Sequence, residues 1–232
     1  MEAETLFYPE RCIRCGRCDE GCYAHAREIV GRDMRVDEVL SEILEDALFY
    51  GKEGGATLSG GEPLLQRAFI LSLIDASHER NIHVAVESNL CFPRDIARPV
   101  LEKVDLLMGD VKLWDADRHR ALTGVGNEWA LENFRMMAEL GKPIILRTPV
   151  VPGINTEPAQ IRRIARFAAS LPTLLYYELL RCHPLGEEKA AALGFNPLHF
   201  ETPSEALMKE LQRSALEAGV RVLVDGQEGW GT

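Results

Sequence analysis

The sequence lacks several features that would place the protein in a specialised class. No run of 18 apolar residues occurs in its 232 residues, and the first residues, MEAETLFYPERC, contain neither a basic start nor an apolar stretch. We therefore expect a cytoplasmic protein without a membrane-spanning helix, a secretory signal or a transit peptide. Basic side chains are also scarce. The chain has 26 Lys and Arg against 36 Asp and Glu, a net charge of −10, which argues against nucleic acid and anionic membranes as partners.

The composition is that of a globular domain. Hydrophobic residues make up 46% of the chain and charged residues 27%, and the length suffices for one sizeable domain with a small appendage. From residue 36 onward, helical periodicity alternates with short apolar runs that are rich in branched residues. This alternation is typical of repeated βα units around a parallel sheet.

Six short apolar runs predict strands, and longer periodic stretches between them predict helices. The strands are expected at 56–58, 82–87, 106–112, 144–148, 174–179 and 220–224. Helices are expected at about 37–51, 63–80, 94–103, 127–140, 157–170 and 203–218. In the first helix we expect Asp37 as N-cap and an apolar stripe that extends to Leu48. This pattern favours a partial (β/α) barrel of about six parallel strands, with an open doubly wound sheet as the alternative.

Four of the six cysteines lie close together near the start of the chain. Cys12, Cys15, Cys18 and Cys22 form C-x-x-C-x-x-C-x-x-x-C, the spacing with which bacterial ferredoxins bind iron–sulfur clusters. A structural zinc site is the alternative, although such sites normally consist of two separated C-x-x-C pairs. The run either holds one cluster or forms half of a larger arrangement, because in two-cluster ferredoxins the fourth cysteine ligates the other cluster. We divide the chain into a ferredoxin-like segment, 1–34, and a barrel, 35–232.

Polar and charged residues lie at or just after the end of five of the expected strands. In chain order they are Gly60, Gly61 and Glu62, then Glu87 and Ser88, then Asp110 and Lys112, then Arg147, and then His183. Taken singly, Asp110 and Lys112 are explained by an ion pair. Arg147 is likewise explained as a partner for Glu87. Taken together, they predict a binding site for a polar ligand, because the carboxyl ends of barrel strands meet at one edge.

The order of these motifs resembles that of the glycyl-radical-enzyme activating proteins of the radical S-adenosylmethionine superfamily, a group that includes pyruvate formate-lyase activase. The resemblance extends from about Cys12 to the end of the chain. It rests on S-G-G-E-P at 59–63, D-V-K at 110–112, T-G-V-x-N at 123–127, L-E-N at 131–133, R-x-P-V-V-P-G-x-N at 147–155 and H-x-L-G-x-x-K at 183–189.

The resemblance implies roles for the residues at the strand ends. Those expected near the amino group of S-adenosylmethionine are Gly60, Gly61 and Glu62, and those expected near its carboxylate and ribose are Lys112, Arg147 and His183. Those that resemble the family's monovalent-cation ligands are Glu87, Ser88 and Asp110. Leu90 stands where the family often has a glycine, which changes the expected geometry of that loop.

The implied activity is reductive cleavage of S-adenosylmethionine to a 5′-deoxyadenosyl radical. This radical takes a hydrogen atom from a glycine of a partner glycyl radical enzyme. Reduced flavodoxin or ferredoxin is the expected electron donor. The cofactors implied are S-adenosylmethionine, one or more [4Fe-4S] clusters and a monovalent cation.

One family motif is absent from this sequence. The family's catalytic cluster is held by C-x-x-x-C-x-x-C after the first barrel strand, and no such spacing occurs here. The run from Cys12 to Cys22 resembles instead the ferredoxin-type insert of the larger activases. We therefore expect an activase without its N-terminal segment and first barrel strand, and we expect these residues alone to be inactive. The alternatives are a degenerate activase that serves as a partner-binding or electron-carrying module, and a non-redox protein with a zinc site.

Overall fold

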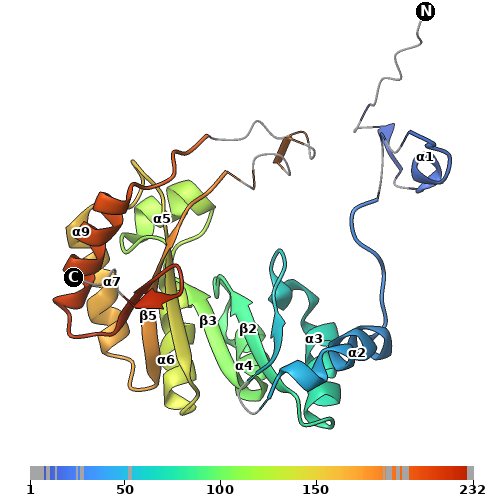
Figure 1. Cartoon of the computed structure of the whole chain (residues 1–232), viewed down its shortest axis with the longest axis horizontal. Coiled ribbons are helices and arrows are strands. Elements are labelled where there is room, and N and C mark those ends of the chain that lie inside the picture. Colours follow the sequence, from blue (N-terminus) through green and yellow to red (C-terminus); the bar gives the residue numbers. More distant parts are fainter. Residues whose placement is uncertain are drawn as a thin grey trace, which may run out of the picture.

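The barrel is a single sheet with helices on one side (Figure 1). The structure, a computed structural model, describes residues 8, 11–13, 15–24, 26, 29–51, 54–184, 186, 190–191, 194 and 199–228. Within these residues the sheet has seven strands, whose spatial order is their order in the chain. None of the helices in the described part of the chain combines the length and the apolarity that a membrane crossing requires.

Six of the strands are parallel. They are β1 (Gly55–Leu58), β2 (His83–Ser88), β3 (Leu106–Asp110), β4 (Ile144–Val150), β5 (Leu174–Arg181) and β6 (Val222–Val224), and the short β7 (Gln227–Glu228) pairs antiparallel with β6. A doubly wound sheet would reverse its strand order at a switch point. The consecutive order confirms the partial barrel and rules out that alternative.

Helices precede β1 and connect the consecutive parallel strands. They are α2 (Val36–Glu45), η2 (Ala47–Phe49), η3 (Pro63–Gln66), α3 (Arg67–His78), α4 (Arg94–Lys103), α5 (Ala116–Thr123), α6 (Glu128–Glu139), α7 (Pro158–Ala169) and α9 (Glu205–Leu216). The apolar faces of α3, α4, α6, α7 and α9 share one core with the sheet, in which Val84 and Leu146 of the strands lie with Ile74 and Phe134 of the helices. The helices therefore cover one face of the sheet.

The opposite face of the sheet is apolar in the middle and charged toward the carboxyl ends of its strands. Ala85, Met108 and Ile145 form a small separate cluster on it. Further along the strands, the register aligns Asp110 with Arg147 and Arg147 with Glu178. Because paired residues of neighbouring strands point to the same face, these three side chains form one row across β3, β4 and β5.

Helix α2 differs from the expectation at both ends. Its N-cap is Arg35, whose backbone N–H donates to the Glu38 carboxylate at 2.7 Å, while Asp37 lies within the first turn and pairs with the Arg35 guanidinium. The helix ends at Glu45, and Leu48 is 94% exposed. The predictions of Asp37 as N-cap and of Leu48 in the packed stripe are therefore wrong.

Among its described residues, the Cys-rich segment contains one short helix, α1 (Arg17–Glu20), which Figure 1 shows apart from the helices that cover the sheet. The stretch before α2 has no regular secondary structure in residues 29–35. A division of the chain at residue 34 stays a prediction.

Candidate functional site

Glu62 connects the loop after β1 to the end of β2. Its carboxylate caps η3 by accepting a hydrogen bond from the Leu64 backbone N–H at 3.2 Å. The same carboxylate accepts one bond from the Ser88 hydroxyl at 2.8 Å and another from the Asn89 backbone N–H at 2.9 Å. Three donors therefore hold this acid in one orientation at the edge of the sheet, close to where the sequence places a ligand.

The two glycines before Glu62 leave their backbone accessible. Gly60 has φ of 124°, a conformation that side chains rarely adopt. A Cβ atom added at Gly60 or Gly61 would meet no heavy atom within 4 Å. A ligand can therefore approach the peptide groups here without displacing a side chain.

Asp110 and Lys112 form an ion pair at the end of β3. The Lys112 Nζ donates to Asp110 Oδ2 at 2.6 Å, and the two side chains are 36% and 24% exposed. Lys112 itself lies just beyond the strand, which ends at Asp110 rather than at the expected residue 112. The ion pair that the sequence suggested is therefore present.

Arg147 lies between two carboxylates on the face of the sheet that the helices do not cover. Its Nε donates to Glu178 Oε2 at 2.9 Å, and its Nη1 lies 3.2 Å from Glu87 Oε1. The expected partner, Glu87, is confirmed. The sequence reasoning missed Glu178, whose side chain is only 5% exposed. Two-residue alternation in β5 could have found it, because it places Glu178 on the same face as Tyr176.

Three buried asparagines hold the loops that carry these residues. The Asn155 amide donates to Lys112 O at 2.8 Å and to Pro149 O at 2.7 Å, which connects the loops after β3 and β4. The Asn133 amide donates to Leu90 O and Phe92 O in the loop after β2. In the same way, the Asn127 amide bonds the carbonyls of residues 113 and 114. The asparagines of the three family motifs therefore shape the loops of this edge.

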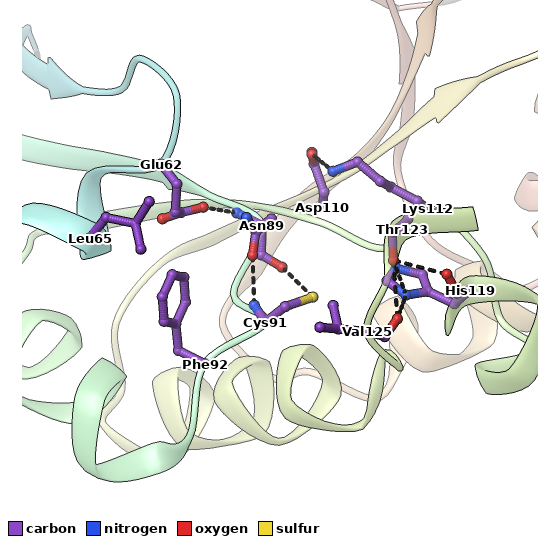
Figure 2. Close-up of a pocket in the computed structure, with 10 residues that line it drawn as sticks. All are labelled: Glu62, Leu65, Asn89, Cys91, Phe92, Asp110, Lys112, His119, Thr123 and Val125. Atoms are coloured by element: carbon purple, nitrogen blue, oxygen red, sulfur yellow. Dashed lines mark hydrogen bonds and ion pairs between the residues drawn. The ribbon is translucent and has the colours of Figure 1, made fainter. Parts of the chain in front are cut away.

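A cavity of about 380 Å³ opens at this edge of the sheet (Figure 2). Its lining residues are Glu62, Leu65, Asn89, Cys91, Phe92, Asp110, Lys112, His119, Thr123 and Val125. Sequence reasoning had given no role to Cys91, and burial raises the pKa of its thiol. It had also missed His119, whose position depends on how the neighbouring loops fold.

The predicted residues fall into two neighbouring groups and one outlier. Glu62, Asp110 and Lys112 line the cavity. The residues that do not line it are Gly60, Gly61, Glu87, Ser88, Arg147 and His183. Of these, Ser88 bonds Glu62, and Arg147 shares its sheet row with Asp110, so both groups lie at one edge. His183 is exposed, two residues beyond β5, and bonds neither group.

The four clustered cysteines have the right chemistry for an iron–sulfur cluster but are not gathered around one point. All six cysteines lie in the described residues, and none forms a disulfide. The Ala26 backbone N–H donates to Cys22 Sγ at 3.2 Å, a type of bond that also stabilises cluster thiolates. Among the described residues, no three Cys, His, Asp or Glu side chains are placed to hold a metal ion. A cluster at Cys12, Cys15, Cys18 and Cys22 stays a prediction.

Comparisons with known proteins place the chain in a family. A protein-family model described as the radical SAM superfamily matches residues 12–168. The chain is 35% identical over 222 residues to the indoleacetate decarboxylase activating enzyme of Tractidigestivibacter scatoligenes, a match that covers 93% of this chain and 70% of that enzyme. It is 37% identical over 219 residues to the isethionate sulfite-lyase activating enzyme of Desulfovibrio desulfuricans, which covers 92% of this chain and 70% of that enzyme.

Solved structures show the same fold. The chain is similar to a crystal structure of a domain of pyruvate-formate lyase-activating enzyme from Bacteroides vulgatus, with a TM-score of 0.62, 29% identity, and coverage of 74% of this chain and 99% of that one. A radical SAM methyltransferase from Sphaerobacter thermophilus shares the fold alone, with a TM-score of 0.63 and 15% identity over 85% of this chain and 59% of that one.

These matches agree with the motifs and with the charged residues at the carboxyl ends of the strands. We call this region the charged edge, and its residues are Glu62, Glu87, Asp110, Lys112, Arg147 and Glu178. Enzymes of this kind use S-adenosylmethionine and a [4Fe-4S] cluster, so both are cofactors of this family. The chain therefore belongs to the radical SAM superfamily and, within it, to the activating enzymes of glycyl radical enzymes.

Proposed function

We propose that the charged edge of the sheet binds S-adenosylmethionine for the activation of a partner glycyl radical enzyme. One observation carries the proposal: acids and bases from the ends of β1 to β5 gather at this edge, and each base is paired with an acid of the same edge. Lys112 pairs with Asp110, and Arg147 pairs with Glu87 and Glu178. Polar groups at the carboxyl ends of barrel strands are typical of ligand sites.

These residues match the two ends of a sulfonium amino acid. An ammonium group needs carboxylate and carbonyl acceptors, and a carboxylate needs lysine or arginine donors. Glu62 and the open peptide groups before it supply acceptors. Lys112 and Arg147 supply donors, and Nη2 of Arg147 has no hydrogen-bond partner among the described residues. His183 is proposed to contact the ribose.

Binding of the cofactor's carboxylate would change the charge balance of the edge. Glu87 and Asp110 are neutralised by Arg147 and Lys112 in the structure. When the two bases turn to the ligand's carboxylate, these acids need another positive charge. A monovalent cation held by Glu87, Ser88 and Asp110 would supply it, because carboxylate and hydroxyl oxygens suit such ions. The proposed cation therefore enters together with the ligand.

The residues of the edge bind and orient the ligand, and the redox chemistry comes from a cluster. When bound, a reduced [4Fe-4S] cluster supplies the electron that cleaves S-adenosylmethionine to a 5′-deoxyadenosyl radical, which takes a hydrogen atom from a glycine of the partner. Cys12, Cys15, Cys18 and Cys22 are proposed to hold a cluster. Reduced flavodoxin or ferredoxin of the cytoplasm is the proposed donor of electrons.

Two lysine variants test the proposed binding site. The full chain is titrated with S-adenosylmethionine by calorimetry, as wild type, as Lys112→Gln and as Lys103→Gln. Lys103 is the matched control, because it pairs with Asp75 of α3 at the C-terminal end of α4, away from the charged edge. A hydrogen bond to a charged group contributes about 1.5–3 kcal/mol, so we expect Lys112→Gln to weaken binding roughly 10-fold or more and Lys103→Gln to leave it unchanged. Equal affinities for all three proteins would refute the assignment.

A further inference from the structure

Asn89 lines the cavity but has no role in the proposed function. It lies on the loop after β2, and Figure 2 shows it between Glu62 and Cys91. Three of its four polar groups are bonded. Its backbone N–H donates to Glu62 Oε2 at 2.9 Å, its side-chain Oδ1 accepts from the Cys91 backbone N–H at 2.8 Å, and its backbone oxygen accepts from Cys91 Sγ at 3.4 Å. The side-chain nitrogen, Nδ2, has no partner among the described residues.

The orientation of the Asn89 amide is fixed by its neighbour. The backbone N–H of Cys91 only donates hydrogen bonds, so the side-chain atom that faces it is the oxygen, and Nδ2 points away from it. Nδ2 is also absent from the buried polar atoms that lack a partner, so it is accessible. Because Asn89 lines the cavity, we infer that this donor faces the cavity.

The backbone beside Asn89 is strained. Leu90 has φ of 56°, a left-handed conformation that is rare for large side chains, and it is fully buried. Its side chain occupies the space beside Gly109, because a Cβ atom added at Gly109 would lie 2.7 Å from Leu90 Cδ1. Its N–H donates to Ser88 Oγ at 3.0 Å, and its carbonyl oxygen accepts from the Asn133 amide at 2.9 Å. Strain of about 1–3 kcal/mol at such a residue persists only where the surroundings enforce it, and it is concentrated at ligand sites. This packing therefore holds the turn that presents Asn89.

Glu62 and Asn89 together match an α-amino acid group. Such a group carries an ammonium and a carboxylate on one carbon atom, so its site needs an acceptor and a donor side by side. The hydrogen bond from the Asn89 backbone to Glu62 fixes these two residues next to each other. The acceptor is the Glu62 carboxylate. The donor is Asn89 Nδ2, which bonds neither Glu62 nor Asp110 although all three residues line the cavity. This donor is therefore available to a ligand.

We propose that Asn89 Nδ2 donates a hydrogen bond to the carboxylate of S-adenosylmethionine, while Glu62 accepts one from the ammonium on the same carbon atom. The inference rests on the proposed function, because it takes S-adenosylmethionine as the ligand of the charged edge. Asn89 is then a residue that determines specificity, since it distinguishes an amino acid from an amine without a carboxylate. Lys112 and Arg147 supply positive charge for this carboxylate, whereas Asn89 is a neutral donor that fixes its position.

The variant Asn89→Ser tests this role by ligand binding. A serine hydroxyl can accept the Cys91 N–H and preserve the turn, but the amide donor is lost. Calorimetric titrations of the full chain compare S-adenosylmethionine with its decarboxylated analogue, which lacks only the carboxylate. A hydrogen bond contributes about 0.5–1.5 kcal/mol, so we expect Asn89→Ser to bind S-adenosylmethionine about 2- to 10-fold more weakly and the analogue as the wild type does. Unchanged binding of S-adenosylmethionine would overturn the proposal. An equal loss for both ligands would also overturn it, because Asn89 would then only shape the loop.

Asn89→Asp is the second variant, and its isosteric side chain keeps an oxygen for the Cys91 N–H. A carboxylate in place of the amide repels the carboxylate of the ligand. We therefore expect S-adenosylmethionine to bind more weakly than it does to Asn89→Ser, while the analogue keeps or gains affinity through its ammonium. The matched controls are Asn81→Ser and Asn81→Asp, because Asn81 is exposed and lies before the opposite end of β2. They should bind both ligands as the wild type does. If Asn89→Asp weakens both ligands equally, or if Asn81→Asp reproduces its effect, the proposal fails.

The variant Lys112→Gln separates this proposal from the proposed function. If the wild type does not bind S-adenosylmethionine, or if Lys112→Gln binds it as tightly as the wild type does, the proposed function fails. If Lys112→Gln weakens binding and a folded Asn89→Ser variant does not, only the role of Asn89 is refuted, and the proposed function stands.

Discussion

Arg147 shows how one residue can serve both the fold and the site. Its partner Glu178 is almost fully buried, and a buried carboxylate is costly unless a charge or hydrogen bonds compensate for it. Its other partner, Glu87, is 44% exposed, so a ligand can replace Glu87 as a partner of the guanidinium more easily than it can replace Glu178. The guanidinium is therefore anchored through Nε by the buried acid, while its terminal nitrogens face the more exposed side, where a ligand would bind.

Removal of the ion pair between Arg147 and Glu178 gives a prediction on the free energy of unfolding. Arg147→Met leaves Glu178 buried without a partner, so we expect it to lower the free energy of unfolding by about 3–5 kcal/mol. The double variant Arg147→Met/Glu178→Gln should regain most of this loss, because no charge is then buried alone. Urea unfolding at neutral pH measures both. A double variant that is no more stable than Arg147→Met would show that the two side chains do not depend on each other.

The lowered pKa of Asp105 lets us predict how the stability of the fold changes as the pH falls. Partial burial raises the pKa of this carboxyl, but hydrogen bonds from the Val84 backbone N–H and from the His78 ring outweigh burial and hold the pKa below its ordinary value of 3.8. The folded chain therefore binds fewer protons at Asp105 than the unfolded chain does. Its contribution to stability is present above the unfolded pKa and is lost as the pH falls through the folded pKa.

Asp105→Asn tests this pH dependence. We expect the urea midpoint of the wild type to fall between about pH 5 and pH 3, and the variant to show a shallower decline over the same range. The wild type should be the more stable at pH 6. If both proteins lose stability in parallel as the pH drops, another carboxyl is responsible.

At the scale of elements, the alternating pattern of the sequence predicts the parallel sheet because each strand has an apolar run and most helices have an apolar stripe. Helix α5 shows where this reasoning fails. Only one of its side chains is buried, and that side chain is His119, so no stripe marks the helix. Its N-cap is visible in hindsight, since Asp115 accepts a hydrogen bond from the Arg118 backbone N–H at 2.9 Å.

The order of strands in the sheet predicts that their backbone amides differ in protection from hydrogen exchange. Within the described residues β1 pairs only with β2, whereas β3 lies between β2 and β4. Amides at the edge of a sheet open more readily than those in its centre. We expect residues 56–58 to exchange at least about tenfold faster than residues 107–109 in native-state hydrogen exchange. Equal protection would mean that another segment covers the edge of β1.

At the scale of the whole molecule, the position of the site follows from topology. In a parallel sheet every strand ends at the same edge, so polar residues such as Glu62, Asp110 and Arg147 could be assigned to one site from the sequence. The Asp110–Lys112 and Arg147–Glu87 pairs could also be suggested, but the pairing of Arg147 with Glu178 could not, because it depends on register. Glu178 lies within a strand and shares a row with Arg147 only through the pairing of β4 with β5. The orientation of the His119 ring likewise depends on the loop between α5 and α6, because Nδ1 lies 2.6 Å from the carbonyl oxygen of Val125.

The central claim is that this edge binds S-adenosylmethionine by both its amino and its carboxylate groups. The most direct measurement compares S-adenosylmethionine with its decarboxylated analogue in calorimetric titrations of the full chain. The two ligands share the ammonium, the sulfonium and the nucleoside and differ only in the carboxylate. We predict that the analogue binds at least about tenfold more weakly to the wild type, and that Lys112→Gln removes most of this difference. Equal affinities of the wild type for the two ligands would contradict the claim.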